Sequence, residues 1–228
     1  MKYLPPKPLI AMVLIAACAG NAWSNGLKSL ENFMREARTG RADFTQVVTA
    51  PARTGEAARS KASSGTFAFA RPGRFRFDYQ KPFEQSIVAD GQTLWLHDVG
   101  LNQVTARKQA SALGSTPAAL IAAAPDLRAL QADFTLAAEA LAPVTPVASA
   151  SASVAEALEW VIATPKNKEG QLQQVRVGFK GNTLAVLEIL DSFGQRSVLT
   201  FGKFETNPTL PSSSFDFKPP AGADVIRQ

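Results

Sequence analysis

The chain has 228 residues, 46% of them hydrophobic, and a formal net charge of +5. Its length favours one domain, its apolar content excludes a largely disordered chain, and its basic residues form no dense cluster that would indicate nucleic-acid binding. One histidine and one cysteine exclude the usual zinc sites and an internal disulfide. Fourteen phenylalanines against two tyrosines indicate a surface that contacts only apolar matter.

Residues 1–24 are predicted to be a signal peptide, which leaves 25–228 as a single domain. Lys2 and Lys7 precede the apolar run Leu9–Ala19, which is too short to span a bilayer and has the length of a signal-peptide core. These features predict export to the periplasm.

Two kinds of processing fit this segment. The small residues of Ala22-Trp23-Ser24 suit signal peptidase, and a cut before Gly20 is also possible. Against both stands the run Ile15-Ala16-Ala17-Cys18, which matches a lipobox and would attach lipid to Cys18. We favour soluble export, because apolar residues, alanine and an occasional cysteine are common inside signal peptides and a plausible cleavage site follows.

The predicted elements begin with an amphipathic helix over Gly26–Arg38, where apolar residues recur at helical spacing. Short strands separated by turn residues follow, and they predict an antiparallel meander that curls into a barrel or half-barrel. The predicted strands are Ala42–Val48, Gly65–Ala70, Arg74–Tyr79, Gln85–Ala89, Thr93–His97, Gln103–Ala106, Phe134–Ala137, Leu158–Thr164, Leu172–Phe179, Thr183–Asp191, Ser197–Phe204 and an edge strand at Phe215–Pro220.

A second, short helix is predicted over Ala118–Ala124, with Pro117 at its first position and Leu120 and Ile121 on its apolar side. A helix that interrupts a meander can cover the mouth of a barrel. The polar segment Pro51–Ser64 is predicted to be a mobile connection between strands.

A second flexible connection is predicted over 138–156, which is rich in alanine, serine and proline.

An aromatic face is predicted around the turn at Pro72-Gly73. The strand Arg74–Tyr79 alternates aromatic and charged side chains, and the strand before the turn repeats the alternation, so the two form a hairpin with one aromatic face. The predicted set, which includes a tryptophan from a later strand, is Phe67, Phe69, Phe75, Phe77, Tyr79 and Trp95. This face is either ordinary core or the lining of a lumen, and a curled sheet of about ten strands can enclose an apolar guest.

No catalytic residue, metal or cofactor is expected. His97 stands beside Asp98, but neighbours on a strand point to opposite faces, and no phosphate-binding loop or nucleophile elbow is present. Arg71 is either a solvated turn residue or a group that reaches carbonyls in the segment Thr116–Ala124. A latch of a few such hydrogen bonds, each contributing about 1 kcal/mol, can open when a ligand competes.

An ordered set of short motifs resembles the outer-membrane lipoprotein carrier family, LolA. The motifs are Phe44-Thr45-Gln46, Gly65-Thr66-Phe67, Arg71-Pro72-Gly73-Arg74-Phe75-Arg76-Phe77, Val88-Ala89-Asp90-Gly91, Leu94-Trp95, Gln103-Val104, Thr116-Pro117, Pro165-Lys166, Asp191-Ser192-Phe193-Gly194-Gln195 and Phe215-Asp216-Phe217-Lys218-Pro219-Pro220-Ala221-Gly222. Each motif is weak alone, but together they span the mature chain in order.

The resemblance implies a mainly β (α+β) fold, an unclosed antiparallel β-barrel with an N-terminal helix and a short central helix as a lid over an apolar cavity. It implies a monomeric periplasmic chaperone that takes lipoproteins from an inner-membrane ABC transporter and passes them to an outer-membrane lipoprotein acceptor. Arg71 matches the arginine that tethers the lid, Phe75 matches a position involved in accepting cargo, and Phe77 matches a barrel-lining aromatic. The acyl-contact residues we then expect are Phe67, Phe69, Phe75, Phe77, Trp95, Leu120 and Ile121.

Two other functions stay open for the same half-barrel. Lipidation at Cys18 would make the protein a membrane-tethered acceptor, and a lipid-sensing regulator would use the cavity without carrying cargo. A lipid-modifying enzyme is disfavoured by the single histidine.

Overall fold

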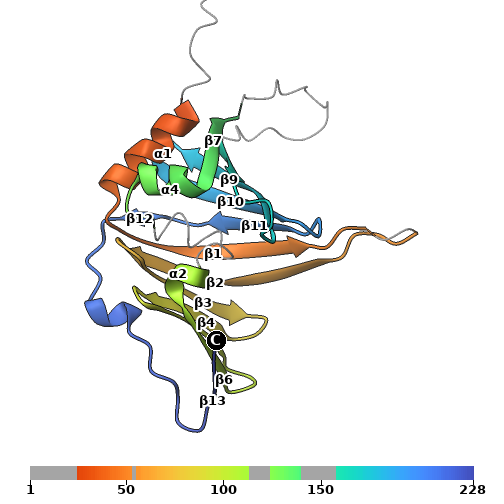
Figure 1. Cartoon of the computed structure of the whole chain (residues 1–228), viewed down its shortest axis with the longest axis vertical. Coiled ribbons are helices and arrows are strands. Elements are labelled where there is room, and N and C mark those ends of the chain that lie inside the picture. Colours follow the sequence, from red (N-terminus) through yellow and green to blue (C-terminus); the bar gives the residue numbers. More distant parts are fainter. Residues whose placement is uncertain (1–24, 53–54, 113–123, 140–157) are drawn as a thin grey trace, which may run out of the picture.

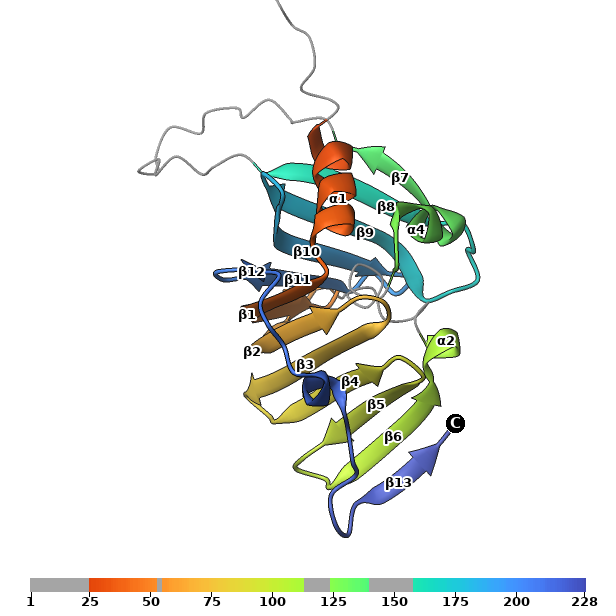
Figure 2. The ribbon, with the colours of Figure 1, turned by 90° about the vertical axis from the view of Figure 1, so that its left-hand side faces the viewer.

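One curved sheet organises the computed structural model, which describes residues 25–52, 55–112, 124–139 and 158–228 (Figure 1). Across the described residues the sheet has 13 strands, ordered β13-β6-β5-β4-β3-β2-β1-β11-β10-β9-β8-β7, and β12 pairs separately with β1. Strands β13 and β7 form opposite edges that do not pair with each other, so the sheet curls without closing (Figure 2). This confirms the predicted half-barrel.

The elements have the following bounds. The strands are β1 (Thr39–Thr49), β2 (Ser60–Ala70), β3 (Arg74–Lys81), β4 (Gln85–Asp90), β5 (Thr93–Asp98), β6 (Gln103–Lys108), β7 (Phe134–Ala138), β8 (Glu159–Pro165), β9 (Leu172–Lys180), β10 (Thr183–Asp191), β11 (Arg196–Phe201), β12 (Glu205–Thr206) and β13 (Asp224–Arg227). The helices are α1 (Asn25–Glu36), α2 (Gln109–Ala112), α4 (Leu127–Asp133) and the 3-10 turn η2 (Ser212–Phe215).

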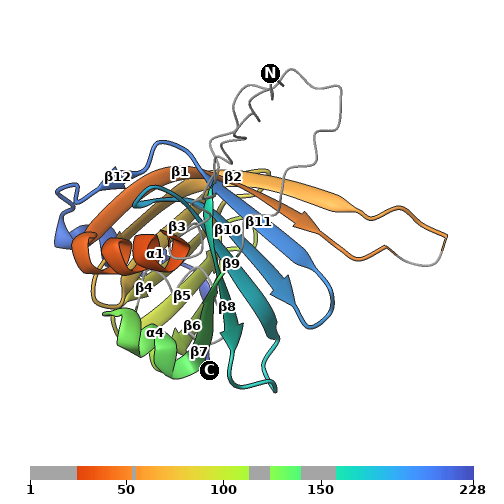
Figure 3. The same ribbon diagram turned by 90° about the horizontal axis from the view of Figure 1, so that it is seen from above.

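Helices α1 and α4 lie on the same side of the sheet (Figure 3). α1 buries Leu30, Phe33 and Met34, whose spacing places them on one side of a helix, against the half of the sheet formed by β7–β10. α4 starts at Asp126, whose side chain accepts a hydrogen bond of 2.9 Å from the Ala129 amide. It buries Leu130 in the same core. The two helices therefore cover the concave side of the sheet.

Strand β2 begins at Ser60, inside the segment that the sequence predicted to be a mobile connection. The ladder between β1 and β2 pairs Ser60 with Thr49 and continues without a shift to Ala70. The first part of β2 is exposed or half-buried. Its sequence does not alternate between apolar and polar residues, so no periodic pattern marks it as a strand. The prediction of a connection over the whole of Pro51–Ser64 was therefore wrong for its last five residues.

The edge strand at the C-terminus also differs from the prediction. Of the residues predicted as a strand, Phe215–Pro220, the first ends η2 and the others are irregular chain, and β13 pairs instead with β6 in parallel. Two prolines in the predicted segment remove backbone donors, which disfavours a ladder there. The segment nevertheless packs on the sheet, because Phe215 is buried against Arg74, with the guanidinium 5.6 Å from the ring centre.

Several predicted features lie outside the described residues. They are the signal peptide over 1–24 with Cys18, the central helix apart from Ala124, the residues Leu120 and Ile121, and most of the flexible segment predicted over 138–156. Within the described ranges, no helix is long and apolar enough to cross a membrane.

Candidate functional site

The concave side of the sheet carries the predicted aromatic face, and the strand register shows how it forms. Phe67 lies opposite Phe77, and Phe69 lies opposite Phe75, so all four side chains share one face of β2 and β3. Phe44 and Phe201 pair across β1 and β11 on the same side. We call these six residues, Phe44, Phe67, Phe69, Phe75, Phe77 and Phe201, the phenylalanine face.

The six rings form one connected cluster. Phe67 stacks on Phe77 with ring centres 4.4 Å apart, and Phe44 meets Phe77 edge-on at 5.6 Å. Each phenylalanine is at most 7% exposed. Phenylalanine rings packed in this way present a surface without hydrogen-bonding groups, which favours contact with apolar groups. In this structure the face is therefore part of a buried core.

Helix α1 covers one end of the phenylalanine face. Phe33 of the helix lies 6.0 Å from Phe69, 5.7 Å from Phe179 on β9 and 5.9 Å from Phe204. One side chain thereby joins both halves of the curled sheet. Access to this end of the face requires the contacts of Phe33 to separate.

Arg71 is buried at the same end, between the two helical regions. Its Nε donates to the Ala37 carbonyl at 2.9 Å, just after α1, and its Nη1 donates to the Ala124 carbonyl at 2.5 Å, before α4. Its guanidinium lies 5.6 Å from the ring centre of Phe33 and 5.1 Å from that of Phe69. One cation therefore links the end of α1, the chain before α4 and the phenylalanine face.

Burial shapes the electrostatics of Arg71. Desolvation, followed by repulsion from the charge of Arg38, lowers its pKa from 12.5 to about 10. The group still carries its charge at neutral pH. A buried charge needs partners, and here two carbonyls and two aromatic rings supply them, while Nη2 has no hydrogen-bond partner among the described residues.

Trp95 does not belong to the phenylalanine face, contrary to the sequence prediction. In the ladder of β4 and β5, Trp95 lies opposite Val88, whereas Leu94 lies opposite Ala89 and shares the side of Phe75. The tryptophan therefore occupies the other face of the sheet. The alternation of side chains within β3 does not determine which face a residue of β5 occupies, because the intervening turns set the register between the strands.

On that other face, Trp95 is held by specific contacts. Its Nε1 donates to Asp90 at 2.9 Å, and its ring lies 5.4 Å from Phe217. Burial of Asp90 opposes ionisation, but hydrogen bonds from Thr93, Trp95 and the Gln92 amide lower its pKa overall. Trp95 thus anchors the C-terminal segment to the outside of the sheet.

At the end opposite Arg71, the inner face becomes polar. Tyr79 Oη donates to Gln46 Oε1 at 2.9 Å, and Gln46 Nε2 donates to Ser197 Oγ at 2.6 Å. The Tyr79 ring remains in the aromatic cluster, 5.1 Å from Phe44. We call Gln46, Tyr79 and Ser197 the polar end of the face.

The half-buried phenol of Tyr79 predicts a loss of stability at high pH. Burial raises its pKa from 10.0 to about 12, so the unfolded chain loses this proton first as the pH rises. The contribution of the neutral phenol is full below pH 10 and is lost as the pH approaches 12. We expect the difference in unfolding free energy between the native chain and Tyr79→Phe to change by roughly 2 kcal/mol between about pH 9 and about pH 11.5.

Urea denaturation of both proteins across this range measures the effect. The comparison with Tyr79→Phe removes the contribution of Arg71, whose lowered pKa acts in the opposite direction. A difference that stays constant with pH would contradict the assignment.

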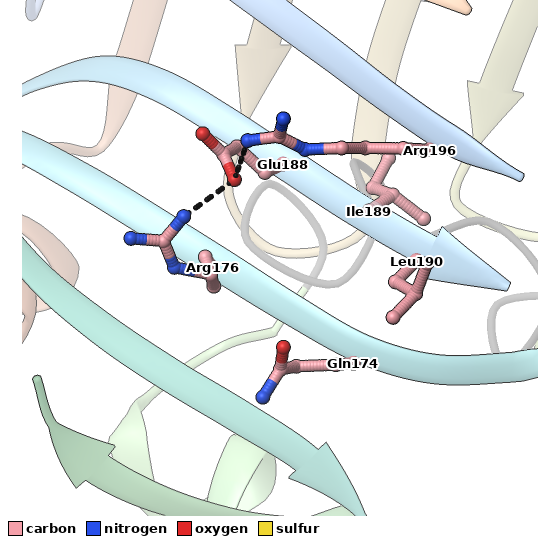
Figure 4. Close-up of a pocket in the computed structure, with 6 residues that line it drawn as sticks. All are labelled: Gln174, Arg176, Glu188, Ile189, Leu190 and Arg196. Atoms are coloured by element: carbon pink, nitrogen blue, oxygen red, sulfur yellow. Dashed lines mark hydrogen bonds and ion pairs between the residues drawn. The ribbon is translucent and has the colours of Figure 1, made fainter. Parts of the chain in front are cut away.

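A pocket of about 310 Å³ lies elsewhere, on β9–β11 (Figure 4). Glu188 accepts from Arg176 at 2.6 Å and from Arg196 at 2.8 Å. Gln174, Ile189 and Leu190 complete its lining. Four of these six residues are polar or charged, and none of them belongs to the phenylalanine face.

Sequence reasoning missed several members of the buried aromatic set. The prediction did not include Phe33, Phe44, Phe179 and Phe201, although β1 alternates apolar and polar residues clearly enough to place Phe44 inward.

No group of histidine, cysteine, aspartate or glutamate in the described parts of the chain could hold a metal ion.

The family model for the outer membrane lipoprotein carrier protein LolA matches residues 35–218. The chain belongs to the LolA family. The match covers the strands of the phenylalanine face, Arg71 and the polar end.

Curated members of the LolA family are similar over nearly their whole length. A protein of Albidiferax ferrireducens named outer-membrane lipoprotein carrier protein is 66% identical over 222 residues, which cover 96% of this chain and 98% of the relative. A protein of the same name from Methylibium petroleiphilum is 50% identical and covers 94% of this chain and 97% of its own length. These matches confirm the predicted family.

A crystal structure of an uncharacterised conserved protein from Thermus thermophilus also has a similar fold. It has a TM-score of 0.50 at 12% sequence identity, and the alignment covers 89% of this chain and 96% of that one. At this identity the likeness concerns the fold alone.

Proposed function

We propose that this LolA-family protein is a periplasmic chaperone that carries lipoproteins by enclosing their acyl chains against the phenylalanine face. The observation that carries the proposal is that face itself, six buried phenylalanines on the concave side of an unclosed sheet, with α1 held over one end. Within the described residues, the inner face offers no set of groups suited to catalysis.

The physical need for such a carrier follows from the cost of exposing acyl chains to water. Each exposed methylene costs about 0.8 kcal/mol, so a lipoprotein with several chains cannot cross an aqueous space unaided. Phenylalanine rings bind hydrocarbon without a hydrogen-bonding requirement, which suits cargo that differs only in its protein part. The face is buried in the free protein, so cargo must replace the side chains that cover it.

Arg71 is placed to act as the latch of this cover. Its hydrogen bonds to Ala37 and Ala124 join the segments that carry α1 and α4. Each bond contributes about 1 kcal/mol net, somewhat more because the donor is charged, and burial of acyl chains offsets that loss when the cover opens. Closure by the same bonds would favour release of cargo.

The direction of transport requires partners that differ in affinity. We propose that an inner-membrane ABC transporter loads the carrier and that an outer-membrane lipoprotein acceptor receives the cargo. The soluble form requires cleavage of the signal peptide without lipidation.

The lipobox ending at Cys18 supports one other candidate, a membrane-tethered acceptor. Mass spectrometry of the mature N-terminus separates the two, because a triacylated Cys18 would contradict the soluble carrier.

The proposal is tested by mixing the mature chain with liposomes that contain a triacylated outer-membrane lipoprotein and separating liposomes by flotation. We expect the lipoprotein to leave the liposomes and to elute with the carrier as a soluble one-to-one complex on size exclusion. Cargo that stays in the liposomes at every carrier excess would overturn the proposal. A non-lipidated form of the same cargo is the control and should not associate.

A further inference from the structure

The inner face of the half-barrel changes from apolar to polar at one end, and three strands change together. Along β1, the inward residue after Phe44 is Gln46, and along β3, the inward residue after Phe77 is Tyr79. On β11 the inward series Phe201, Leu199 ends at Ser197, because these residues pair with Phe44, Gln46 and Val48. The change from apolar to polar residues therefore occurs at the same end of the inner face on three strands.

Gly65 allows Tyr79 on β3 to reach Gln46 on β1, which meets Ser197 on the adjacent strand β11. Gly65 pairs with both Phe44 and Tyr79, and a Cβ atom there would come within 2.0 Å of the Asp78 carbonyl oxygen. With no side chain at this position, the Tyr79 ring reaches Phe44 and its hydroxyl reaches Gln46. Any other residue at position 65 would separate the strands that form the polar end.

The hydrogen bonds at the polar end leave donors available. Tyr79 gives its proton to Gln46, and Gln46 uses one amide proton on Ser197. The second amide proton of Gln46 and the hydroxyl proton of Ser197 have no acceptor among the described residues. Tyr79 fixes which way the Gln46 amide points, because its donated proton requires the amide oxygen.

Solvent reaches the face from this end. Phe69 and Phe75, beside Arg71, are 1% and 0% exposed, whereas Gln46 and Tyr79 are half-buried and Val48 beyond them is half-buried too. A molecule with a long apolar part and a polar part would therefore place its apolar part toward Arg71 and its polar part beside Gln46.

We propose that Gln46 and Ser197 bind the ester and amide carbonyls that join acyl chains to the lipid-modified end of the cargo, oriented by Tyr79. This subsite rests on the proposed carrier function and adds an orientation to it, with acyl chains extending from the polar end toward Arg71. Carbonyl oxygens only accept hydrogen bonds, and the polar end offers two donors at the edge of an apolar surface. Ether lipids lack ester carbonyls and would use the phenylalanine face alone.

The test compares two synthetic lipopeptides, a tripalmitoyl-cysteinyl peptide with ester-linked chains and its analogue in which the two esters are replaced by ethers. Affinities are measured by displacement of a fluorescent apolar probe from the mature chain. We expect the native protein to bind the ester form about fivefold to thirtyfold more tightly, the effect of one or two hydrogen bonds. Gln46→Leu and Ser197→Ala should each reduce this preference, and the double variant should abolish it.

The control is Thr45→Ala, which changes the neighbour of Gln46 on the exposed side of β1 and should keep the preference. Equal affinity of the native protein for both lipopeptides, or an ester preference that survives in the double variant, would overturn the subsite while leaving the carrier function intact. Failure to bind either lipopeptide would instead contradict the carrier function. Thermal unfolding of each variant confirms that affinities are compared between folded proteins.

Discussion

Replacing Arg71 by leucine is expected to slow the release of cargo about tenfold or more while complex formation persists. The change removes the hydrogen bonds to the Ala37 and Ala124 carbonyls and the contacts with the rings of Phe33 and Phe69. The closed form then loses stability relative to the open, loaded form, and every 1.4 kcal/mol of that difference changes the equilibrium tenfold. Leucine also adds apolar surface that can contact acyl chains directly.

The measurement follows the transfer of a labelled lipoprotein from the loaded carrier to liposomes that bear the acceptor. Arg38→Leu is the matched control, because it removes a neighbouring arginine whose side chain is exposed. Release from Arg71→Leu at the native rate would count against the latch. An accompanying rise in apolar-probe fluorescence of the free variant is expected, because the cover over the phenylalanine face opens more often.

Replacing Phe75 by glutamate is expected to abolish complex formation at neutral pH. Phe75 is fully buried and pairs with Phe69, so an ionised carboxylate there must be desolvated by rings or by acyl chains. Desolvation costs several kcal/mol per ion, which exceeds the gain from a few methylene groups. Lowering the pH should restore part of the binding as the carboxyl group takes up a proton.

Phe75→Leu is the companion variant, because it keeps the position apolar and of similar volume and should cost less than about 1.5 kcal/mol of stability. Lipopeptide affinity is measured for both proteins, with urea denaturation as the check on folding. Native-like binding by a folded Phe75→Glu protein would show that acyl chains do not reach this part of the face.

The sequence predicted those parts of the molecule that depend on local alternation. The positions of Phe67, Phe69, Phe75 and Phe77 on one face follow from a period of two within strands and from one turn, and the structure has them there. Trp95 was assigned to the wrong face of the sheet. The face that it occupies depends on the geometry of two further turns, which no local sequence pattern determines.

The remaining differences have the same kind of cause. Ser60–Ser64 forms part of β2 through backbone pairing alone, without apolar side chains that would mark a strand. The residues that cover the face, above all Phe33, come from a helix whose apolar side is evident in the sequence. What that helix covers depends on contacts between distant segments. The polar end was not predicted, because its three residues come from three strands and Tyr79 reaches Gln46 only across Gly65.

Photo-crosslinking tests the central claim, that acyl chains contact the face that is buried in the free protein. Phe77 is replaced by p-benzoyl-phenylalanine, and the same residue is placed at Trp95, on the opposite face, as the control. After loading with a triacylated lipoprotein and illumination, we expect covalent carrier–cargo adducts through the acyl chains from position 77 and none from position 95. Adducts from position 95, with none from position 77 in a folded and loaded protein, would show that the phenylalanine face is core that cargo never contacts.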